Sequence, residues 1–84
     1  MKRIDVVNAF LENARPCCTP NRSLSVAFGK LYSYATPIAI VLGNTCFIVS
    51  RKYSVTTSHH QSMTRREALK QGFKVESVEN LPII

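Results

Sequence analysis

One stretch of the chain, residues 51 to 62, is dense in side chains that donate or accept hydrogen bonds. Two cations and a tyrosine open it, three consecutive hydroxyl residues follow, and two histidines and a glutamine come near its end. Such residue types bind anions and polar surfaces when a strand-to-helix junction displays them together. We therefore expect a binding surface made of Arg51, Lys52, Tyr53, Thr56, Thr57, Ser58, His59, His60 and Gln61, with Arg66 and Lys70 from the following helix.

The hydroxyl residues stand where a helix is expected to begin. The first N–H groups of a helix have no partner within it, and its N-terminus carries about half a positive charge, so anions bind there. Arg51 and Lys52 lie just upstream, which favours a phosphate-binding edge, and Tyr53 can stack on a base. The alternative is that the hydroxyls only cap the helix, the cations are solvated and Tyr53 belongs to the core.

The cations of the following helix are not equivalent. Arg66 and Lys70 are four residues apart and share one helix face. Arg65 is rotated from Arg66 by about 100°, so we expect it to flank the core. The predicted cationic set is Arg51, Lys52, Arg66 and Lys70.

Metal binding and catalysis are alternative uses of the same residue types. Zinc ligands of the right kind are present, namely His59, His60, Cys17, Cys18 and Cys46. Adjacent residues rarely both reach one tetrahedral ion, and no Cys-x-x-Cys or His-x-x-x-His spacing occurs. A nuclease-like site would need groups that orient the histidines, and Glu67 is a lone carboxylate nearby. We expect no metal, no cofactor and no enzymatic activity.

Length and charge bound the class of protein. A chain of 84 residues with 45% hydrophobic content forms one domain, residues 1–84. Its 11 Lys and Arg against 5 Asp and Glu give a net charge of +6, which attracts polyanions or acidic protein surfaces. Nucleic acid is the leading partner class on this ground, and an inert basic surface is the alternative.

The apolar segments predict neither a signal peptide nor a membrane helix. Asp5 and Asn8 interrupt the N-terminal apolar residues, and the longest apolar stretch, residues 37–49, is shorter than the roughly 20 residues of a membrane span. The three cysteines lack the spacing of a disulfide framework, so we expect free thiols and a cytoplasmic protein. Cys46 should be buried in the sheet, with Cys17 or Cys18 exposed.

Hydrophobic periodicity places the elements in the first half of the chain. Apolar residues at helical spacing predict a helix over residues 4–14, which Arg15-Pro16 ends. Residues 15–22 read as a loop. Alternating residues predict a strand over 23–34 with a bulge at Gly29, and two more strands, 36–42 and 45–50, flank a hairpin turn at Gly43-Asn44. This turn is too short for a parallel crossover.

The second half predicts a helix and a short closing strand. Ser58 with Gln61 and Thr64 with Glu67 are two candidate capping boxes, and the earlier start gives a helix over about residues 59–71 that ends by Gly72. Residues 73–78 then suggest a strand, and the apolar tail 81–84 is expected to pack on the body. The predicted fold is α+β, with a small antiparallel sheet of about three strands and two packing helices.

Two segments resemble a pattern of small uncharacterised bacteriophage and mobile-element proteins. In that pattern a YS-T-PIA strand leads through a short turn to a KYS-TTS-HQ segment, and the chain shows it in residues 31–39, the Gly43-Asn44 turn and residues 51–61. The resemblance implies a phage-like origin, the host cytoplasm as location, and a small accessory or host-directed role. It assigns no chemistry to any residue.

Two function classes follow from charge and resemblance. The first is a non-enzymatic accessory protein that binds nucleic acid or a nucleoprotein complex through the basic junction. The second is an inhibitor that occludes an acidic surface of a host defence or transcription machine, as anti-CRISPR proteins do. Salt-dependent oligonucleotide binding separates the two, because phosphate contacts weaken steeply with salt.

Overall fold

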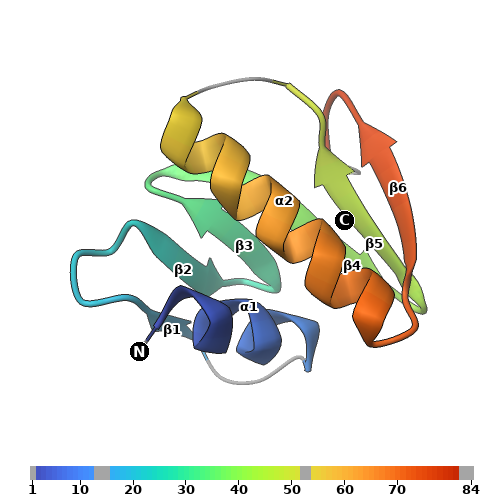
Figure 1. The fold of residues 1–84 in the computed structure, drawn as a ribbon, viewed down its shortest axis with the longest axis horizontal. Helices are drawn as coiled ribbons and strands as arrows, with labels where there is room; N and C mark the ends of the chain where they lie inside the picture. The colour runs from blue at the N-terminus through green and yellow to red at the C-terminus, as the bar shows by residue number, and fades with distance from the viewer. Residues whose placement is uncertain (1, 13–15, 52–53, 82–84) are drawn as a thin grey trace.

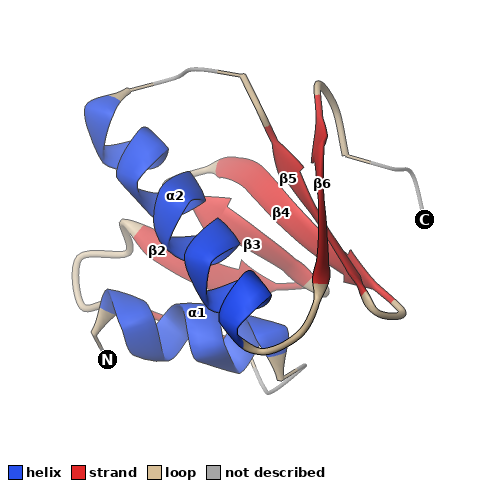
Figure 2. Cartoon of the chain, turned by 45° about the vertical axis from the view of Figure 1, so that its right-hand side comes forward, coloured by secondary structure: helices blue, strands red, loops and turns tan. Residues whose placement is uncertain are grey.

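The computed structural model describes residues 2–12, 16–51 and 54–81, which form two helices and six strands (Figure 1). In chain order these are α1 (Arg3–Leu11), β1 (Cys17–Cys18), β2 (Leu24–Ala27), β3 (Lys30–Ser33), β4 (Thr36–Leu42), β5 (Thr45–Val49), α2 (Val55–Lys70) and β6 (Lys74–Val78). All strands belong to one sheet, and both helices lie on one face of it (Figure 2). The α+β class is confirmed.

The sheet is mixed and larger than the predicted antiparallel sheet of about three strands, so that prediction was wrong. Strands β1 to β5 form an antiparallel meander in chain order, and β6 pairs with β5 in parallel. A parallel pair needs a long crossover connection, and α2 supplies it. The short Gly43-Asn44 turn argued against parallel pairing of the two strands that it connects, β4 and β5, and these are antiparallel.

The hairpin between β4 and β5 is the feature that the sequence predicted most directly. Gly43, with φ of +60°, and Asn44 connect the two strands, and Leu42 pairs with Thr45 across them. Strand β5 then lies between β4 and β6. This strand is therefore an interior strand of the sheet.

Gly29 belongs to a turn and not to the predicted bulge. Phe28 and Gly29, with φ of +53° and +74°, form a two-residue connection between β2 and β3. Two positive φ values are typical of the type I′ turn, whose twist matches that of the strands. After this turn a new strand begins, with its own alternation of inward and outward side chains. Leu31 and Ser33 point toward the helices, and Tyr32 points away.

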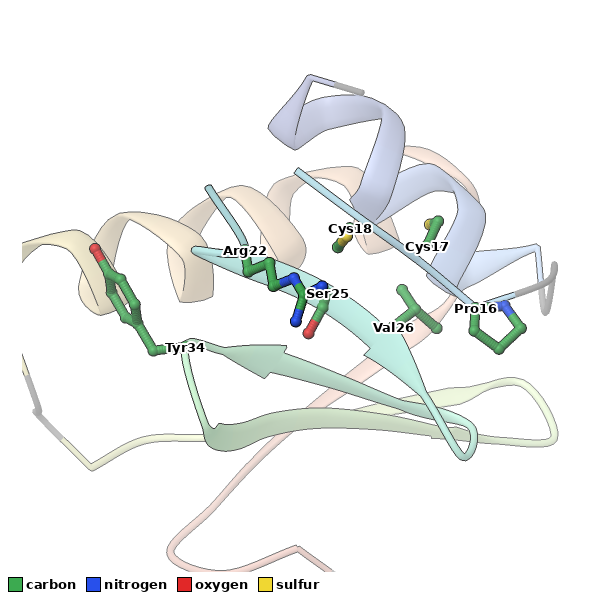
Figure 3. Close-up of a pocket in the computed structure, with 7 residues that line it drawn as sticks. All are labelled: Pro16, Cys17, Cys18, Arg22, Ser25, Val26 and Tyr34. Atoms are coloured by element: carbon green, nitrogen blue, oxygen red, sulfur yellow. The ribbon is translucent and has the colours of Figure 1, made fainter. Parts of the chain in front are cut away.

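The predicted loop over residues 15–22 contains a short edge strand. Cys17 and Cys18 pair with Val26 and Ser25 of β2 (Figure 3). The partners are seven and nine residues further along, beyond a loop whose two prolines do not reveal the pairing. The loop prediction was wrong for this strand.

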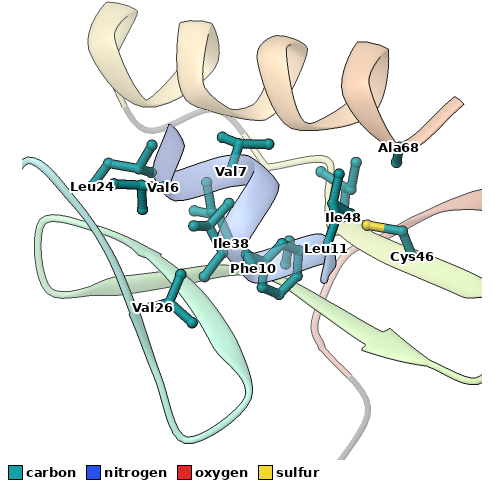
Figure 4. Close-up of a cluster of buried hydrophobic side chains, with 12 residues drawn as sticks. Val6, Val7, Phe10, Leu11, Leu24, Val26, Ile38, Cys46, Ile48 and Ala68 are labelled. Atoms are coloured by element: carbon teal, nitrogen blue, oxygen red, sulfur yellow. The ribbon is translucent and has the colours of Figure 1, made fainter. Parts of the chain in front are cut away.

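The core lies between the sheet and the two helices (Figure 4). It consists of apolar side chains from α1 (Val6, Val7, Phe10, Leu11), from the sheet (Leu24, Val26, Leu31, Ile38, Ala39, Cys46, Ile48) and one residue of α2, Ala68. Full burial of a large aliphatic side chain contributes about 1.5–3 kcal/mol. The predicted first helix is confirmed, although α1 ends at Leu11, and residues 13–15 of the prediction lie outside the described residues.

The C-terminal part follows the predicted order. Helix α2 ends at Lys70, and Gly72 has φ of +88°, the left-handed conformation that glycine permits after a helix. Strand β6 is the predicted closing strand. Leu81 of the tail is half-buried, and residues 82–84 lie outside the described residues. Neither described helix is long and apolar enough to cross a membrane.

Candidate functional site

Helix α2 begins earlier than the sequence predicted. Ser54 is the N-cap, and its Oγ accepts a hydrogen bond of 3.2 Å from the backbone N–H of Thr57. The predicted start at Ser58 was wrong, so the three consecutive hydroxyl residues lie inside the first turns of the helix. Residue 57 is Thr rather than Glu or Gln, and the capping-box pattern therefore passes over Ser54.

Exposure separates the predicted site residues, so they do not form one continuous surface. Exposed are Arg51, His59, Arg66 and Lys70; half-buried are Thr56, Ser58 and Gln61; buried are Thr57 and His60. Lys52 and Tyr53 lie outside the described residues. The helical period explains the division, because adjacent residues such as His59 and His60 point about 100° apart.

Gln61 ties α2 to the end of β5. Its side-chain Nε2 donates to the carbonyl oxygens of Val49, at 2.6 Å, and Arg51, at 3.2 Å. The guanidinium of Arg51 donates to Oδ1 of Asn80 at 3.4 Å. Gln61 therefore has a structural role, whereas Arg51 is exposed at the edge of the molecule.

A buried hydrogen-bond network joins α2 to β3. Oγ of Ser33 lies 2.9 Å from Oγ1 of Thr57 and 2.8 Å from Nδ1 of His60. Thr64 adds a bond of 2.7 Å within the helix, from its hydroxyl to the carbonyl oxygen of His60. We call Ser33, Thr57 and His60 the buried triad. It gives two of the predicted site residues a partner inside the protein.

The hydroxyl groups of the triad are compatible with one proton arrangement on His60. Ser54 donates to Oγ1 of Thr57 at 3.2 Å, and the same direction can continue from Thr57 to Ser33 and from Ser33 to Nδ1 of His60. This assignment places the ring proton on Nε2. Within the described part of the chain, Nε2 is buried and has no hydrogen-bond partner.

Burial also determines the charge of His60. Desolvation lowers the pKa of His60 below its ordinary value of 6.5, and the nearby charges of Arg3 and His59 lower this pKa further. The imidazole is therefore neutral at pH 7. A neutral ring can accept a hydrogen bond from Ser33 at Nδ1, as the triad requires.

A hydroxyl beside an imidazole also has the composition of a nucleophile and its general base. In this chain Ser33 is 1% exposed and His60 is 0% exposed, so a substrate does not reach either group. The pair forms a buried hydrogen bond that connects α2 to β3. Sequence reasoning missed Ser33, although the Leu31–Ser33 alternation would have placed it inward once the Phe28-Gly29 turn was recognised.

The side of α2 that faces solvent is basic. Its exposed side chains, which we call the α2 outward face, are Val55, His59, Ser62, Arg65, Arg66, Leu69 and Lys70. Three of them are Lys or Arg, and none is acidic. Arg65, which was expected to flank the core, is exposed, and its guanidinium donates to Oγ of Ser77 in β6 at 2.6 Å.

Comparison with known protein families gives a match over most of the chain. Residues 7–78 match the family of unknown function DUF8033. The chain belongs to this family. The matched region runs from within α1 to the end of β6, so it includes both the buried triad and the α2 outward face. No curated protein matches the chain, and no solved structure matches it.

The cysteines of this DUF8033 protein differ in exposure. All three are free thiols, as predicted, with Cys46 buried, Cys17 half-buried and Cys18 exposed. Burial raises the pKa of Cys46 to about 11 and also raises that of Cys17, with Cys18 as a second cause. No group of three or more His, Cys, Asp or Glu within the described ranges could hold a metal ion.

Proposed function

We propose that this DUF8033 protein binds nucleic acid through the α2 outward face, without catalysing a reaction. The supporting observation is the charge of that face, which has three exposed Lys or Arg side chains, an exposed histidine and no carboxylate. The exposed acidic residues belong to other elements, Asp5 and Glu12 to the α1 region and Glu76 and Glu79 to the β6 region. The one carboxylate of α2, Glu67, is half-buried, so the exposed side chains of this helix carry a net positive charge.

The spacing of the cations suits a chain of phosphates. Arg66 and Lys70 are one helical turn apart, and His59 lies about two turns before Arg66 on the same side. At 1.5 Å per residue, His59 to Lys70 spans about 16 Å. Neutralising phosphates along this line releases condensed counterions, which supplies most of the affinity of sequence-independent binding.

The buried triad supports the proposal by fixing the helix. Hydrogen bonds from Thr57 and His60 to Ser33, and from Gln61 to the end of β5, define how α2 is rotated on the sheet. Cations on a rigid element lose less entropy when they bind a polyanion. We therefore assign Thr57, His60 and Gln61 to positioning, and Arg66 and Lys70 to contact.

The test is charge reversal with a control of equal net charge. Arg66→Glu/Lys70→Glu removes two cations of the α2 outward face, whereas Lys30→Glu/Lys74→Glu changes the net charge equally on β3 and β6. Fluorescence anisotropy with a labelled mixed-sequence oligonucleotide, over a series of salt concentrations, gives affinity and salt slope. We expect the α2 variant to bind at least tenfold more weakly than the control and to lose about two units of slope.

Two results would overturn the proposal. The first is wild-type protein that binds no oligonucleotide at 50 mM salt, a condition under which phosphate contacts are strong. The second is equal weakening by both double variants, because long-range net charge would then account for binding. Circular dichroism of each variant confirms that the comparison is made between folded proteins.

An acidic host-protein partner is the second candidate. The observation that favours it is apolar exposure on the same face, since Val55 is 75% and Leu69 is 59% exposed. An inhibitor of a host machine would also fit the resemblance to bacteriophage proteins. Val55→Ser/Leu69→Ser should abolish capture of such a partner from nuclease-treated host lysate, and it should leave oligonucleotide binding intact if only phosphates are contacted.

A further inference from the structure

Two residues other than glycine hold a strained backbone at one end of the β2–β3 pair. Arg22, before β2, and Tyr34, after β3, have φ of +57° and +56°. Residues with a Cβ rarely adopt this left-handed backbone conformation. Tyr34 is the first residue of the two-residue turn between β3 and β4, a position at which glycine is usual. Strain of this kind clusters at binding sites.

The side chains of both residues line one open pocket of about 390 Å³. Its other lining residues are Pro16, Cys17, Cys18, Ser25 and Val26. Figure 3 shows Tyr34 toward one end of the group and Pro16 toward the other, with Arg22 between them. The volume is in the range of sites for small ligands or single groups.

Hydrogen bonds hold the two strained residues in place. The N–H of Tyr34 donates to the carbonyl oxygen of Ser23 at 3.0 Å, and the N–H of Arg22 donates to that of Thr19 at 2.9 Å. Oδ1 of Asn21 accepts from the N–H of Ser23 and from the hydroxyl of Thr19. The pocket wall is therefore formed before a ligand arrives, which lowers the entropic cost of binding.

The chemistry of the lining points to one class of ligand. Tyr34 is 55% exposed, Arg22 offers a guanidinium, and Val26 and Pro16 add apolar surface. An aromatic ring that stacks on bases beside a cation that contacts the backbone is the combination that binds single-stranded nucleic acid. We propose that the pocket holds an unpaired nucleobase stacked on Tyr34, with Arg22 contacting the adjacent phosphate.

The pocket adjoins the helix of the proposed nucleic-acid surface. The ring centroids of Tyr34 and His60 are 6.5 Å apart, with an angle of 43° between the rings, so Tyr34 stands beside the N-terminal half of α2. The inference rests on the proposed function and narrows its ligand to single strands. Bases of a duplex are paired and stacked, and they enter a pocket only after being flipped out.

The experiment compares single-stranded and duplex oligonucleotides of equal length by fluorescence anisotropy. Tyr34→Phe keeps the stacking ring and Tyr34→Leu removes it. We expect Tyr34→Phe to bind like wild type, and Tyr34→Leu to bind single strands roughly tenfold more weakly while its duplex binding is unchanged. Arg22→Gly suits the left-handed backbone, so that variant should fold and should lose about one unit of salt slope with single strands.

The outcomes separate this inference from the proposed function. Wild-type protein that binds neither form would overturn both. If wild type binds and Tyr34→Leu retains full single-strand affinity, the pocket inference fails while the role of α2 stands. An equal loss of single-strand affinity in Tyr34→Phe and Tyr34→Leu would also contradict stacking, because Phe keeps an aromatic ring at this position and Leu does not. Thermal unfolding of each variant shows whether it is folded.

Discussion

The two helices lie on the same face of the sheet, yet their inward faces differ in kind. Helix α1 buries Val6, Val7, Phe10 and Leu11, whereas α2 buries Thr57, His60, Thr64 and Ala68. Apolar burial is strong and has no preferred direction. A hydrogen bond contributes less net free energy to folding, but it requires a particular donor and acceptor to be in contact. Helix α1 therefore supplies stability, and α2 supplies a defined orientation.

Orientation matters because α2 carries charges on its other side. A rotation of the helix by about 100° would exchange exposed His59 and buried His60, which are adjacent in the chain. The bonds of the buried triad resist such a rotation, since Ser33 is part of the sheet. The weak point of the triad is Nε2 of His60, for which the described residues provide no partner.

The largest expected effect is the loss of an aromatic core residue from α1. Phe10 is 3% exposed, so Phe10→Ala should lower the free energy of unfolding by about 3–5 kcal/mol, through lost transfer energy and a cavity. Urea titration measures it, with the exposed Leu69→Ala as control. If Thr57→Val, which removes an inward hydroxyl of α2, costs as much as Phe10→Ala, the contrast between the helices is wrong.

A smaller effect is expected when the shared hydroxyl of the triad is removed. Ser33→Ala leaves Nδ1 of His60 and the hydroxyl of Thr57 without their buried partner. The expected loss is about 1–3 kcal/mol. Ser62→Ala, on the outward face of the same helix, should change stability by no more than about 0.5 kcal/mol. Equal free energies of unfolding of the two variants would contradict a stabilising role of the buried triad.

The pH dependence of stability tests the buried imidazole. Because the pKa of His60 is lower in the folded than in the unfolded state, unfolding takes up a proton at intermediate pH. The contribution of His60 to stability is therefore complete above about pH 6.5 and declines as pH falls from there through the folded-state pKa. The difference between wild type and His60→Gln in urea titrations should shrink over that range. A difference that is constant from pH 7.5 to 5 would contradict the assignment.

The smallest effect concerns thiol reactivity and leaves the fold unchanged. Cys18 is exposed, whereas Cys46 is 0% exposed with its pKa raised to about 11, so little thiolate is available there. A thiol reagent should modify Cys18 first and Cys46 only during opening of the helix layer. Mass spectrometry of partly labelled native protein gives the order. Faster labelling of Cys46 would mean that α2 does not stay closed over β5.

The contrast between the helices also explains which parts of the fold the sequence predicted. The apolar period of α1 identifies that helix, and Gly43-Asn44 and Gly72 mark a turn and a helix end by their backbone freedom. These signals are local. Free cysteines and the closing strand were predicted from equally local patterns.

The missed features depend on partners outside the segment itself, seven or nine residues away for β1 and more than twenty residues away for the others. Strand β1 exists through pairing with β2, and the parallel β5–β6 pair exists because α2 crosses over the sheet. The inward side of α2 is polar, so an apolar period does not distinguish inside from outside, and Thr57 and His60 were assigned to a binding surface. Their common partner, Ser33, lies 24 and 27 residues away in sequence.

The two adjacent histidines provide the most direct test of the central claim, that the inner side of α2 orients the helix and its outer side binds nucleic acid. Their imidazole ¹H–¹⁵N correlations can be followed by NMR while a single-stranded oligonucleotide is added, with His59→Gln and His60→Gln to assign the signals. We expect the His59 signals to shift in a saturable manner and those of His60, still bonded to Ser33, to move far less. Unchanged His59 signals at a saturating oligonucleotide concentration would contradict the claim.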